Sequence, residues 1–226
     1  MCVDYCKRPL HLDGFYPALA KPNCTVLREN LVEYTEKGVV SSNKTTGAKT
    51  ERAFDVIIFG TGFNVAQFLE HEKITGINGL DLQVKWKEHP EALYGLATNQ
   101  FPNMFYCFGP NSAHVWSSQQ DSWERQARFA AKAVKEVVVR ERKGVNFAMH
   151  PQREREIEYN NQVQSGQAGK YVWARSDCVT YYKNDDGWNT YTMPWTWWQF
   201  RHMLRKIIWN EWEVLEKPLS KVKKDI

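Results

Sequence analysis

The sequence predicts an α/β fold whose sheet is only partly encoded in this chain. The first half contains short apolar runs separated by turn residues, which is typical of strands. Beyond residue 115 apolar residues recur at three- and four-residue steps, which is typical of helices. Of the ten tryptophans, only Trp86 precedes that point. We therefore expect strands first and helices after them, without internal repeats.

The predicted strands surround one hairpin. The segments CTVLREN, LVEYT, VVSS and FDVIIFG are expected to be strands, with a polar loop, NKTTGAKT, before the last of them. Gly38 is expected to supply the positive φ of the hairpin turn in LVEYTEKGVVSS. LYGLAT and MFYCFG should be two further short strands, joined by a loop at Pro102. The strand-turn-helix unit that opens such a sheet is expected to be missing.

The predicted helices lie in the second half. One amphipathic helix should end near Lys143, with Gly144 as its C-cap. A polar helix is expected in PQREREIEYNNQVQSG, and a last helix over WWQFRHMLRKIIWNEWEVL, ahead of a loose tail. The apolar stripe expected to face the core in the first helix consists of Trp123, Ala127, Ala130, Val134 and Val137.

Composition excludes several classes of protein. With 42% hydrophobic and 25% charged residues, the chain is typical of a globular protein, and no apolar run is long enough to span a bilayer. The N-terminus has no signal-peptide pattern, so we expect a cytoplasmic protein. A net charge of +4 with mixed signs is far from a nucleic-acid-binding signature. The five cysteines lack the spacing of a zinc site or a disulfide framework, and reduced thiols are expected.

The stretch DVIIFGTGFNVA resembles a dinucleotide-binding turn. Gly60 and Gly62 follow a strand-like run at the right spacing. A complete fingerprint needs a small residue three positions after the second glycine, where the helix packs on the strand, and Val65 stands there instead. The turn is therefore not a pyrophosphate loop.

Four motifs in order resemble the C-terminal part of class B flavoprotein monooxygenases, most closely those of the Baeyer–Villiger type. Their order and spacing match from residue 6 to about residue 130, although Gly60 replaces a usual alanine and Asn64 a common aspartate. The motifs are Lys7 and Arg8 before Asp13–Tyr16, the turn of Gly60, Thr61, Gly62 and Phe63, the segment Phe101–Phe105, and Gly109, Pro110, Asn111 and Ser112.

The resemblance implies an enzyme that uses FAD and NADPH. In that family NADPH reduces FAD, and oxygen then forms a flavin peroxide that inserts one oxygen atom into a ketone or onto a soft heteroatom. The glycine-rich loops that bind both cofactors are absent from this sequence, so a missing N-terminal half is implied and the chain alone is expected to be inactive. The expected partners are a small organic substrate and O2.

The resemblance also assigns roles to residues. Arg8, beside Lys7, matches the arginine that stabilises the reduced flavin and the peroxide anion, whereas without the resemblance it reads as a surface arginine. The Gly60–Phe63 turn is where the family's chain returns to the FAD domain.

The segment GPNSAHVWSS offers a second part of the flavin site. A turn that opens a helix would present free backbone N–H groups to the flavin, lined by Asn111, Ser112 and His114. The alternatives are that Asn111 or Ser112 caps the helix and that His114 is structural.

Two domain assignments follow from the resemblance. Residues 1–145 correspond to the C-terminal part of a Rossmann-like FAD-binding domain of the glutathione-reductase type with a β-hairpin insertion, and residues 1–20 end the return from the NADPH domain. Residues 146–226 form a helical, Trp-rich extension. The alternative function is a non-catalytic remnant or a protein-interaction module derived from such an enzyme.

Overall fold

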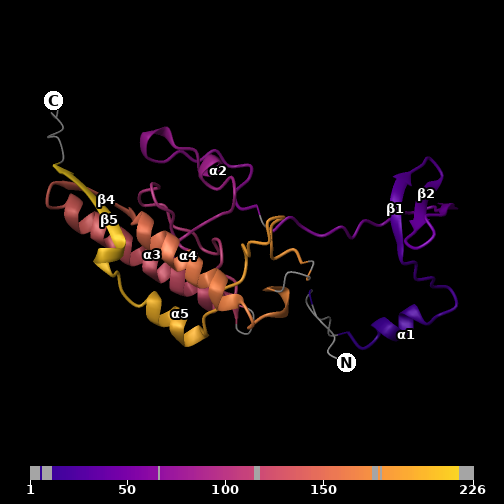
Figure 1. Ribbon diagram of the computed structural model, residues 1–226. Helices are drawn as coiled ribbons and strands as arrows, with labels where there is room; N and C mark the ends of the chain where they lie inside the picture. Colours follow the sequence, from indigo (N-terminus) through magenta and orange to yellow (C-terminus); the bar gives the residue numbers. More distant parts are fainter. Residues whose placement is uncertain are drawn as a thin grey trace. The chain divides into compact units, whose positions relative to one another are not determined.

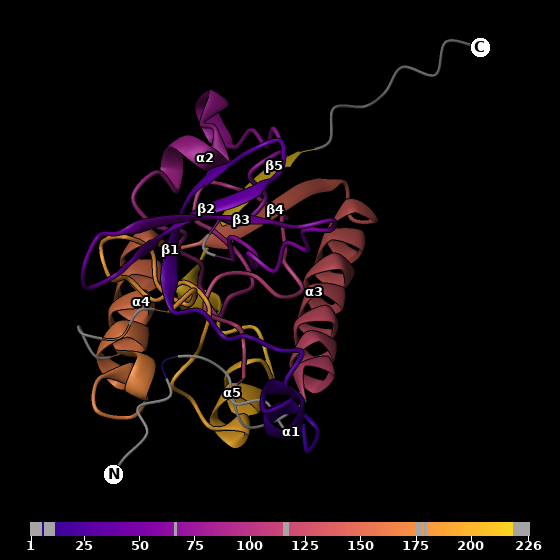
Figure 2. The same cartoon turned by 90° about the vertical axis from the view of Figure 1, so that its right-hand side faces the viewer.

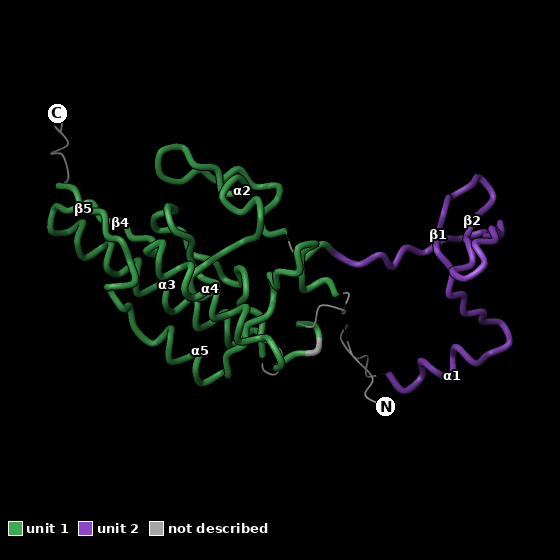
Figure 3. The backbone as a smooth tube through the Cα atoms, in the orientation of Figure 1, with its two compact units in different colours: residues 1–7, 64–226 green, residues 8–63 purple. Residues whose placement is uncertain are grey.

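The computed structural model describes residues 6, 12–65, 67–114, 118–174, 178 and 180–218. The chain divides into two compact units, drawn in green and purple in Figure 3. Unit 1 comprises residues 1–7 and 64–226, and unit 2 comprises residues 8–63. Lys7 and Arg8 lie outside the described residues.

Unit 2 contains a short helix and a three-stranded antiparallel sheet. Helix α1 (Phe15–Leu19) precedes the strands β1 (Glu29–Tyr34), β2 (Gly38–Asn43) and β3 (Lys49–Ala53), of which Figure 1 labels α1, β1 and β2. The spatial order of the strands is β1-β2-β3. The predicted hairpin is confirmed as the β1–β2 pair. β3 was not predicted, because its residues read as the end of a polar loop and the first residues of the next segment.

Gly38 is required for a different reason from the one predicted. Its φ is not positive. A β-carbon at Gly38 would lie 2.0 Å from the carbonyl oxygen of Arg52, on the neighbouring strand. The glycine therefore permits a close approach of two backbones, and the prediction of a left-handed turn residue was wrong.

The expected strand FDVIIFG is not formed. Residues 56–64 have no regular secondary structure, and no strand among the described residues pairs with them. Their apolar side chains are exposed, with Ile58 90% and Phe63 89% accessible. A strand-like sequence without a neighbouring strand has no partner for its backbone hydrogen bonds, which explains the difference.

Unit 1 is built on two long helices and a two-stranded antiparallel sheet. The helices are α3 (Gln119–Glu141) and α4 (Arg153–Gln167), and the strands are β4 (Val145–Pro151) and β5 (Trp212–Pro218). Figure 2 shows α3 and α4 on opposite sides of the unit. The short elements are η1 (Ile77–Gly79), α2 (Leu82–Lys85), η2 (Val172–Ala174), α5 (Trp197–Met203) and η3 (Trp209–Glu211).

The core of unit 1 lies between these elements. Phe129 of α3, Phe147 of β4 and Tyr159 of α4 are almost fully buried in one cluster. Phe200 of α5 and Trp212 of β5 close it. Because the cluster joins residues more than 80 positions apart in sequence, from Phe129 to Trp212, the burial of apolar area by the second half of the chain holds the unit together.

Helix α3 was predicted correctly, but most of its core face was not. Gly144 has the positive φ (80°) expected of a residue that follows a helix. The buried positions of α3 are Ser122, Gln126, Phe129 and Ala133, each one residue before a member of the predicted stripe. Val137, the last member of the stripe, does pack against the core. Gln126 is buried because both ends of its amide are hydrogen-bonded, which an apolar pattern cannot show.

Two expected strands, LYGLAT and MFYCFG, are loops instead, the first buried and the second only partly buried. Tyr94, Gly95 and Phe108 have positive φ values, which break an extended conformation. The loops still contact each other through the backbone, because the amide of Tyr106 donates to the carbonyl of Leu96 at 2.7 Å.

The last predicted helix is half helix and half strand. α5 ends at Met203, and residues 212–218 form β5, paired along its whole length with β4. Glu211, at the junction, accepts hydrogen bonds from the Tyr94 hydroxyl at 2.7 Å and from Arg155 Nε at 2.9 Å. A strand partner more than 60 residues away overrides the local helical pattern.

Two of the five cysteines form a disulfide, which corrects the expectation of reduced thiols. Cys6 and Cys178 are bonded, with their Cα atoms 5.3 Å apart. A separation of 172 residues conceals this pairing from any spacing pattern. Cys24 and Cys107 are free. No helix in the described part of the chain is long and apolar enough to cross a membrane.

Candidate functional site

The predicted site residues fall into three groups. Lys7 and Arg8 are not described. Gly60, Thr61, Gly62 and Phe63 belong to unit 2, and the segment from Gly109 to His114 belongs to unit 1. Each of the two described groups therefore lies within its own unit.

The Gly60–Phe63 turn is exposed. Gly62 has a φ of 83°, the left-handed conformation that glycine adopts without strain. No atom lies within 4 Å of the position that a β-carbon would take at Gly60 or Gly62. Both glycines thus leave room for a close neighbour.

The GPNS turn is held where the backbone at Gly109 passes close to the backbone at Gly95. The amide of Gly109 donates to the carbonyl of Gly95 at 3.2 Å. A β-carbon at Gly109 would lie 2.6 Å from that carbonyl oxygen, and one at Gly95 would lie 2.6 Å from the β-carbon of Ser112. Any larger residue at either position would force the two loops apart.

Asn111 joins the turn to residues 189–192. It is fully buried, with a φ of 53° that asparagine tolerates better than most residues. Its backbone amide donates to Thr190 at 3.0 Å, and its side-chain amide donates to the carbonyls of Asn189 (2.8 Å) and Thr192 (3.0 Å). The asparagine therefore holds two loops together.

The backbone N–H groups expected to be free are mostly engaged. The amide of Ala113 donates to Tyr191, and that of His114 donates to Gln119 Oε1 at 3.1 Å. The helix begins at Gln119 with Ser118 as N-cap residue, so neither Asn111 nor Ser112 caps it. The turn therefore differs from the predicted donor site at a helix N-terminus, and a role of its side chains in flavin binding stays a prediction.

Two buried groups of the turn have unused hydrogen-bonding capacity. Asn111 Oδ1 and both ring nitrogens of His114 have no hydrogen-bond partner among the residues that the structure describes. Buried polar atoms without partners are costly, so such atoms fit a ligand or an added segment that would supply hydrogen bonds. The flavin-binding role expected of Asn111 and His114 stays a prediction.

His114 is kept neutral by its surroundings. The side chain is almost completely buried, and this burial lowers its pKa below the usual value. The Thr196 backbone opposes the lowering without reaching hydrogen-bond geometry, and Lys170 adds to it. A neutral imidazole can donate through one nitrogen and accept through the other.

Gln126 supports the turn from α3. Its side-chain NH2 donates to the Gly95 carbonyl at 2.9 Å, and its Oε1 accepts from the amide of Phe108 at 2.9 Å. Residues 189–192 are supported in the same way from α4, where Gln167 exchanges hydrogen bonds with Thr192 at 2.8 and 3.0 Å. Sequence reasoning missed both glutamines, since neither belongs to a motif.

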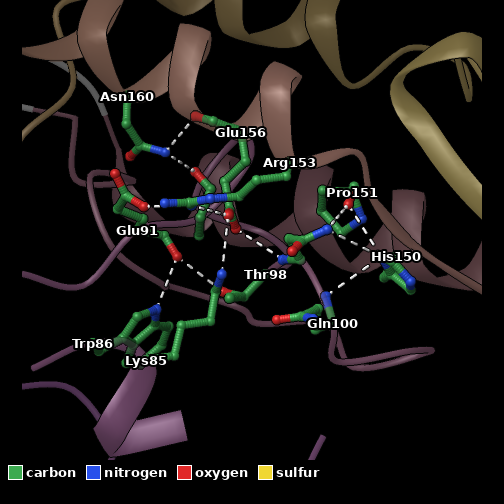
Figure 4. A network of polar contacts seen from close by, with 12 residues as sticks. Lys85, Trp86, Glu91, Thr98, Gln100, His150, Pro151, Arg153, Glu156 and Asn160 are labelled. Atoms are coloured by element: carbon green, nitrogen blue, oxygen red, sulfur yellow. Dashed lines mark hydrogen bonds and ion pairs between the residues drawn. The ribbon is translucent and has the colours of Figure 1, made fainter. Parts of the chain in front are cut away.

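A buried charge network anchors the loop before the turn (Figure 4). Glu156 of α4 has a fully buried side chain. Its carboxylate lies 2.7 Å from Arg153 Nη1 and 3.5 Å from Lys85 Nζ, and it accepts the backbone amide of Asn99 at 2.8 Å. Burial raises the pKa of Glu156, while Lys85, the Asn99 amide and Arg153 oppose the rise. The two cations and the hydrogen bond offset the cost of burying the carboxylate.

The rest of the network fixes the loop to α2 and β4. Arg153 also pairs with Glu91 at 2.6 Å, and the indole of Trp86 donates to the Glu91 carbonyl at 3.0 Å. The side chain of Asn99 donates to the Pro151 carbonyl at 2.8 Å. The negative charges of Glu91 and Glu156 are balanced by the positive charges of Lys85 and Arg153. We interpret the network as a structural support, because its members are satisfied by one another.

The described residues contain no group of three or more His, Cys, Asp or Glu side chains that could hold a metal ion.

The chain is similar to monooxygenases over nearly its whole length. It is 32% identical to the FAD-binding monooxygenase BOA2 of Botryotinia fuckeliana over 216 residues, which are 95% of this chain and 40% of that protein. It is also 32% identical to a Baeyer–Villiger monooxygenase of Pseudomonas aeruginosa, over 95% of this chain and 39% of that protein. No family model matches the chain.

A solved structure shows the same fold. The crystal structure of cyclohexanone monooxygenase from Rhodococcus sp. Phi1 bound to NADP+ matches 93% of this chain and 39% of that chain, with a TM-score of 0.74 and 26% identity.

Fold and sequence thus agree on a mixed α/β chain that is similar to flavin-dependent monooxygenases. The resemblance predicted from the four motifs is confirmed, and the chain is homologous to the C-terminal part of Baeyer–Villiger monooxygenases. It spans about 40% of the length of the curated relatives that it matches.

Proposed function

We propose that the chain is the C-terminal portion of an FAD- and NADPH-dependent monooxygenase that transfers one oxygen atom from O2 to a ketone or a soft heteroatom. The observation that carries the proposal is the similarity of 95% of the chain to about 40% of FAD-binding and Baeyer–Villiger monooxygenases. In this proposal residues 1–145 belong to a Rossmann-like FAD-binding domain, and residues 146–226 form its Trp-rich extension. When bound, FAD supplies the reaction with O2 and NADPH supplies the electrons.

The chain's own residues would contact the cofactor and stabilise the negative charge that develops on it. Arg8, beside Lys7, would place a fixed positive charge next to the reacting centre, where negative charge develops. The Gly60–Phe63 turn, which leaves space around its glycines, would lie against the cofactor. In unit 1, His114 and Asn111 Oδ1 hold the buried hydrogen-bonding capacity that a cofactor could use.

The exposed segment of unit 2 supports the same proposal. Val56, Ile58 and Phe59 are typical of a buried strand, yet 63% or more of each is accessible. An apolar run of this kind is unfavourable in water. We propose that it pairs with the portion that the relatives carry outside the matched region.

The test is reconstitution of flavin binding. The purified chain is mixed with FAD, with and without the N-terminal portion of the Pseudomonas aeruginosa relative, and flavin absorbance and NADPH oxidation are measured. We expect colourless protein from the chain alone, and bound flavin with NADPH oxidation from the mixture. Failure of the mixture to bind flavin, with both parts folded by circular dichroism, would overturn the proposal.

A second candidate function rests on the same exposed run. A non-catalytic module could use Ile58 and Phe63 to bind another protein. Such a module would remain colourless in the mixture and would not need Arg8, so the reconstitution distinguishes the two functions.

A further inference from the structure

A basic cavity lies where α5 packs on α3. Its volume is about 650 Å3. Its lining residues come from the middle of α3 and from α5 with the residues just after it, so it lies within unit 1. They are Arg125, Arg128, Ala131, Lys132, Trp198, Arg201, His202, Leu204 and Arg205.

Five of the lining residues are cations, and none is an acid. Only Arg125 and Arg128 have acidic partners, in the turn of α3 before each: Asp121 lies 3.1 Å from Arg125, and Glu124 pairs with Arg128. The Arg128–Glu124 pair is exposed, and exposed pairs are weak and exchange readily with a competing anion, whereas Arg125 and Asp121 are both half-buried.

Lys132 is used by the protein itself. Its Nζ donates to the carbonyl of Arg205 at 2.6 Å and to that of Leu204 at 3.3 Å. It therefore satisfies carbonyl groups at the C-terminal end of α5. These hydrogen bonds connect α3 to the two residues that follow α5 at the wall of the cavity.

Arg201 and Arg205 have no acidic partner among the ion pairs of the described residues. The guanidinium of Arg201 lies over two indole rings, 5.2 Å from the centroid of Trp197 and 5.6 Å from that of Trp198. Cation–π contacts hold the guanidinium in place without neutralising it. Trp198 remains 70% exposed.

A solvated basic face is the ordinary explanation of several lysines and arginines on a helix. Such a face is usually convex and carries both signs of charge. Here the cations surround a concave space with Ala131 and Leu204 in its lining, and unpaired cations held close together repel each other unless an anion joins them. Three to five cations are too few for a nucleic-acid track and suit a small ligand.

We propose that this cavity binds a small organic phosphate that carries two or more negative charges and a flat aromatic group, as in a nucleoside diphosphate. Arg201 and Arg205 would bind the phosphate oxygens, because guanidinium groups match phosphate geometry with paired hydrogen bonds. The exposed indole of Trp198 would stack on the aromatic group. The inference goes beyond the proposed monooxygenase function and requires neither FAD nor NADPH.

The test measures binding of GDP, inorganic pyrophosphate and guanosine to the purified chain by isothermal titration calorimetry. GDP is the probe because it is not a part of FAD or NADPH. We expect GDP to bind more tightly than pyrophosphate, guanosine not to bind, and the affinity for GDP to fall as salt is raised. Absence of GDP binding would overturn the proposal.

Substitutions locate the site. Arg201→Gln and Arg205→Gln should each weaken GDP binding roughly tenfold or more, as expected for a lost charged hydrogen bond. Trp198→Ala should reduce the affinity for GDP roughly tenfold, towards that for pyrophosphate, through lost stacking. Lys135→Gln removes one charge from α3 outside the cavity and should leave binding unchanged. Equal weakening by all four changes would show a non-specific charge effect and would overturn the proposal.

A lipid phosphate is the other source of the same chemistry. Vesicles of phosphatidylcholine with phosphatidic acid are therefore tested by cosedimentation. Binding to vesicles without binding to GDP would overturn the assignment of a soluble organic phosphate. Circular dichroism of each variant confirms that a loss of binding is not a loss of fold.

Discussion

Glu156 shows how one buried charge fixes a loop. Its side chain is fully buried, and Lys85 and Arg153 are its charged partners. Substituting Glu156→Gln keeps a hydrogen-bond acceptor for the Asn99 amide but removes the charge. Since Lys85 would then be left nearly buried without its partner, we expect a loss of about 3 kcal/mol in the free energy of unfolding, measured by urea titration.

The matched control is Glu158→Gln on the same helix. Glu158 is largely exposed and pairs with Arg155 at 2.8 Å. Its loss should change the free energy of unfolding by no more than about 0.5 kcal/mol. A similar effect of both substitutions would contradict a special role for the buried carboxylate.

His114 makes stability depend on pH. Its pKa in the folded chain lies below the ordinary histidine value of about 6.5, because burial disfavours the charged ring. In acid the unfolded chain therefore takes up the proton first. The contribution of His114 is complete above about pH 6.5 and is lost as pH falls through the folded pKa.

The measurement is the free energy of unfolding from pH 7.5 down to pH 5, for the parent chain and for His114→Gln. We expect a smaller loss of stability in acid for the variant, whatever its stability at neutral pH. The exposed residue His71 provides the comparison through His71→Gln, which should keep the slope of the parent. An unchanged slope in His114→Gln would show that the buried ring does not carry the effect.

At the scale of elements, close backbone contact decides the shape of the GPNS turn. In Gly109→Ala the new methyl group would lie 2.6 Å from the carbonyl oxygen of Gly95, so the two loops must separate. We expect a loss of about 1–3 kcal/mol, seen as a lower midpoint in thermal unfolding of unit 1. Gly14→Ala is the control, because no atom lies within 4 Å of the added carbon. This substitution should leave the midpoint of thermal unfolding unchanged. Equal midpoints for the parent and Gly109→Ala would show that the backbones at Gly95 and Gly109 are not packed tightly enough to exclude a methyl group.

The sequence pattern correctly predicted the elements whose conformation is determined by residues close to them in the chain. α3, α4 and the β1–β2 hairpin follow from periodicity and from turn residues. β5 could not be predicted, because its strand character comes from pairing with β4. The same holds for Gly38, whose requirement comes from β3 and not from its own turn.

The candidate site was predictable in part for a similar reason. The motifs directed attention to Asn111 and His114, and both are buried with unused hydrogen-bonding atoms. Gln126, which supports the turn, and Glu156, which supports the loop before it, belong to no motif, and each has a partner 30 or more residues away: Gly95 for Gln126 and Asn99 for Glu156. Polar side chains at helical spacing give no signal of burial, so the supports become visible only in the fold.

At the scale of the whole molecule, the exposed apolar run of unit 2 tests whether the chain needs another portion. Ile58 is 90% exposed, so Ile58→Lys should leave the unfolding of the isolated chain unchanged within about 0.5 kcal/mol. If the run pairs with the N-terminal portion of a relative, the lysine would be buried there without a partner, and association should be lost. Size-exclusion chromatography and flavin absorbance of the mixture measure this.

The control for that experiment lies in the same unit. Val26 is also exposed but lies outside the run, so Val26→Lys adds the same charge and should still associate and bind flavin. Association of Ile58→Lys at the level of the parent would show that the run is not the joining surface. Loss of association by both variants would instead show that added positive charge alone prevents assembly. Only loss confined to Ile58→Lys fits an unpaired strand that a second portion of the protein completes.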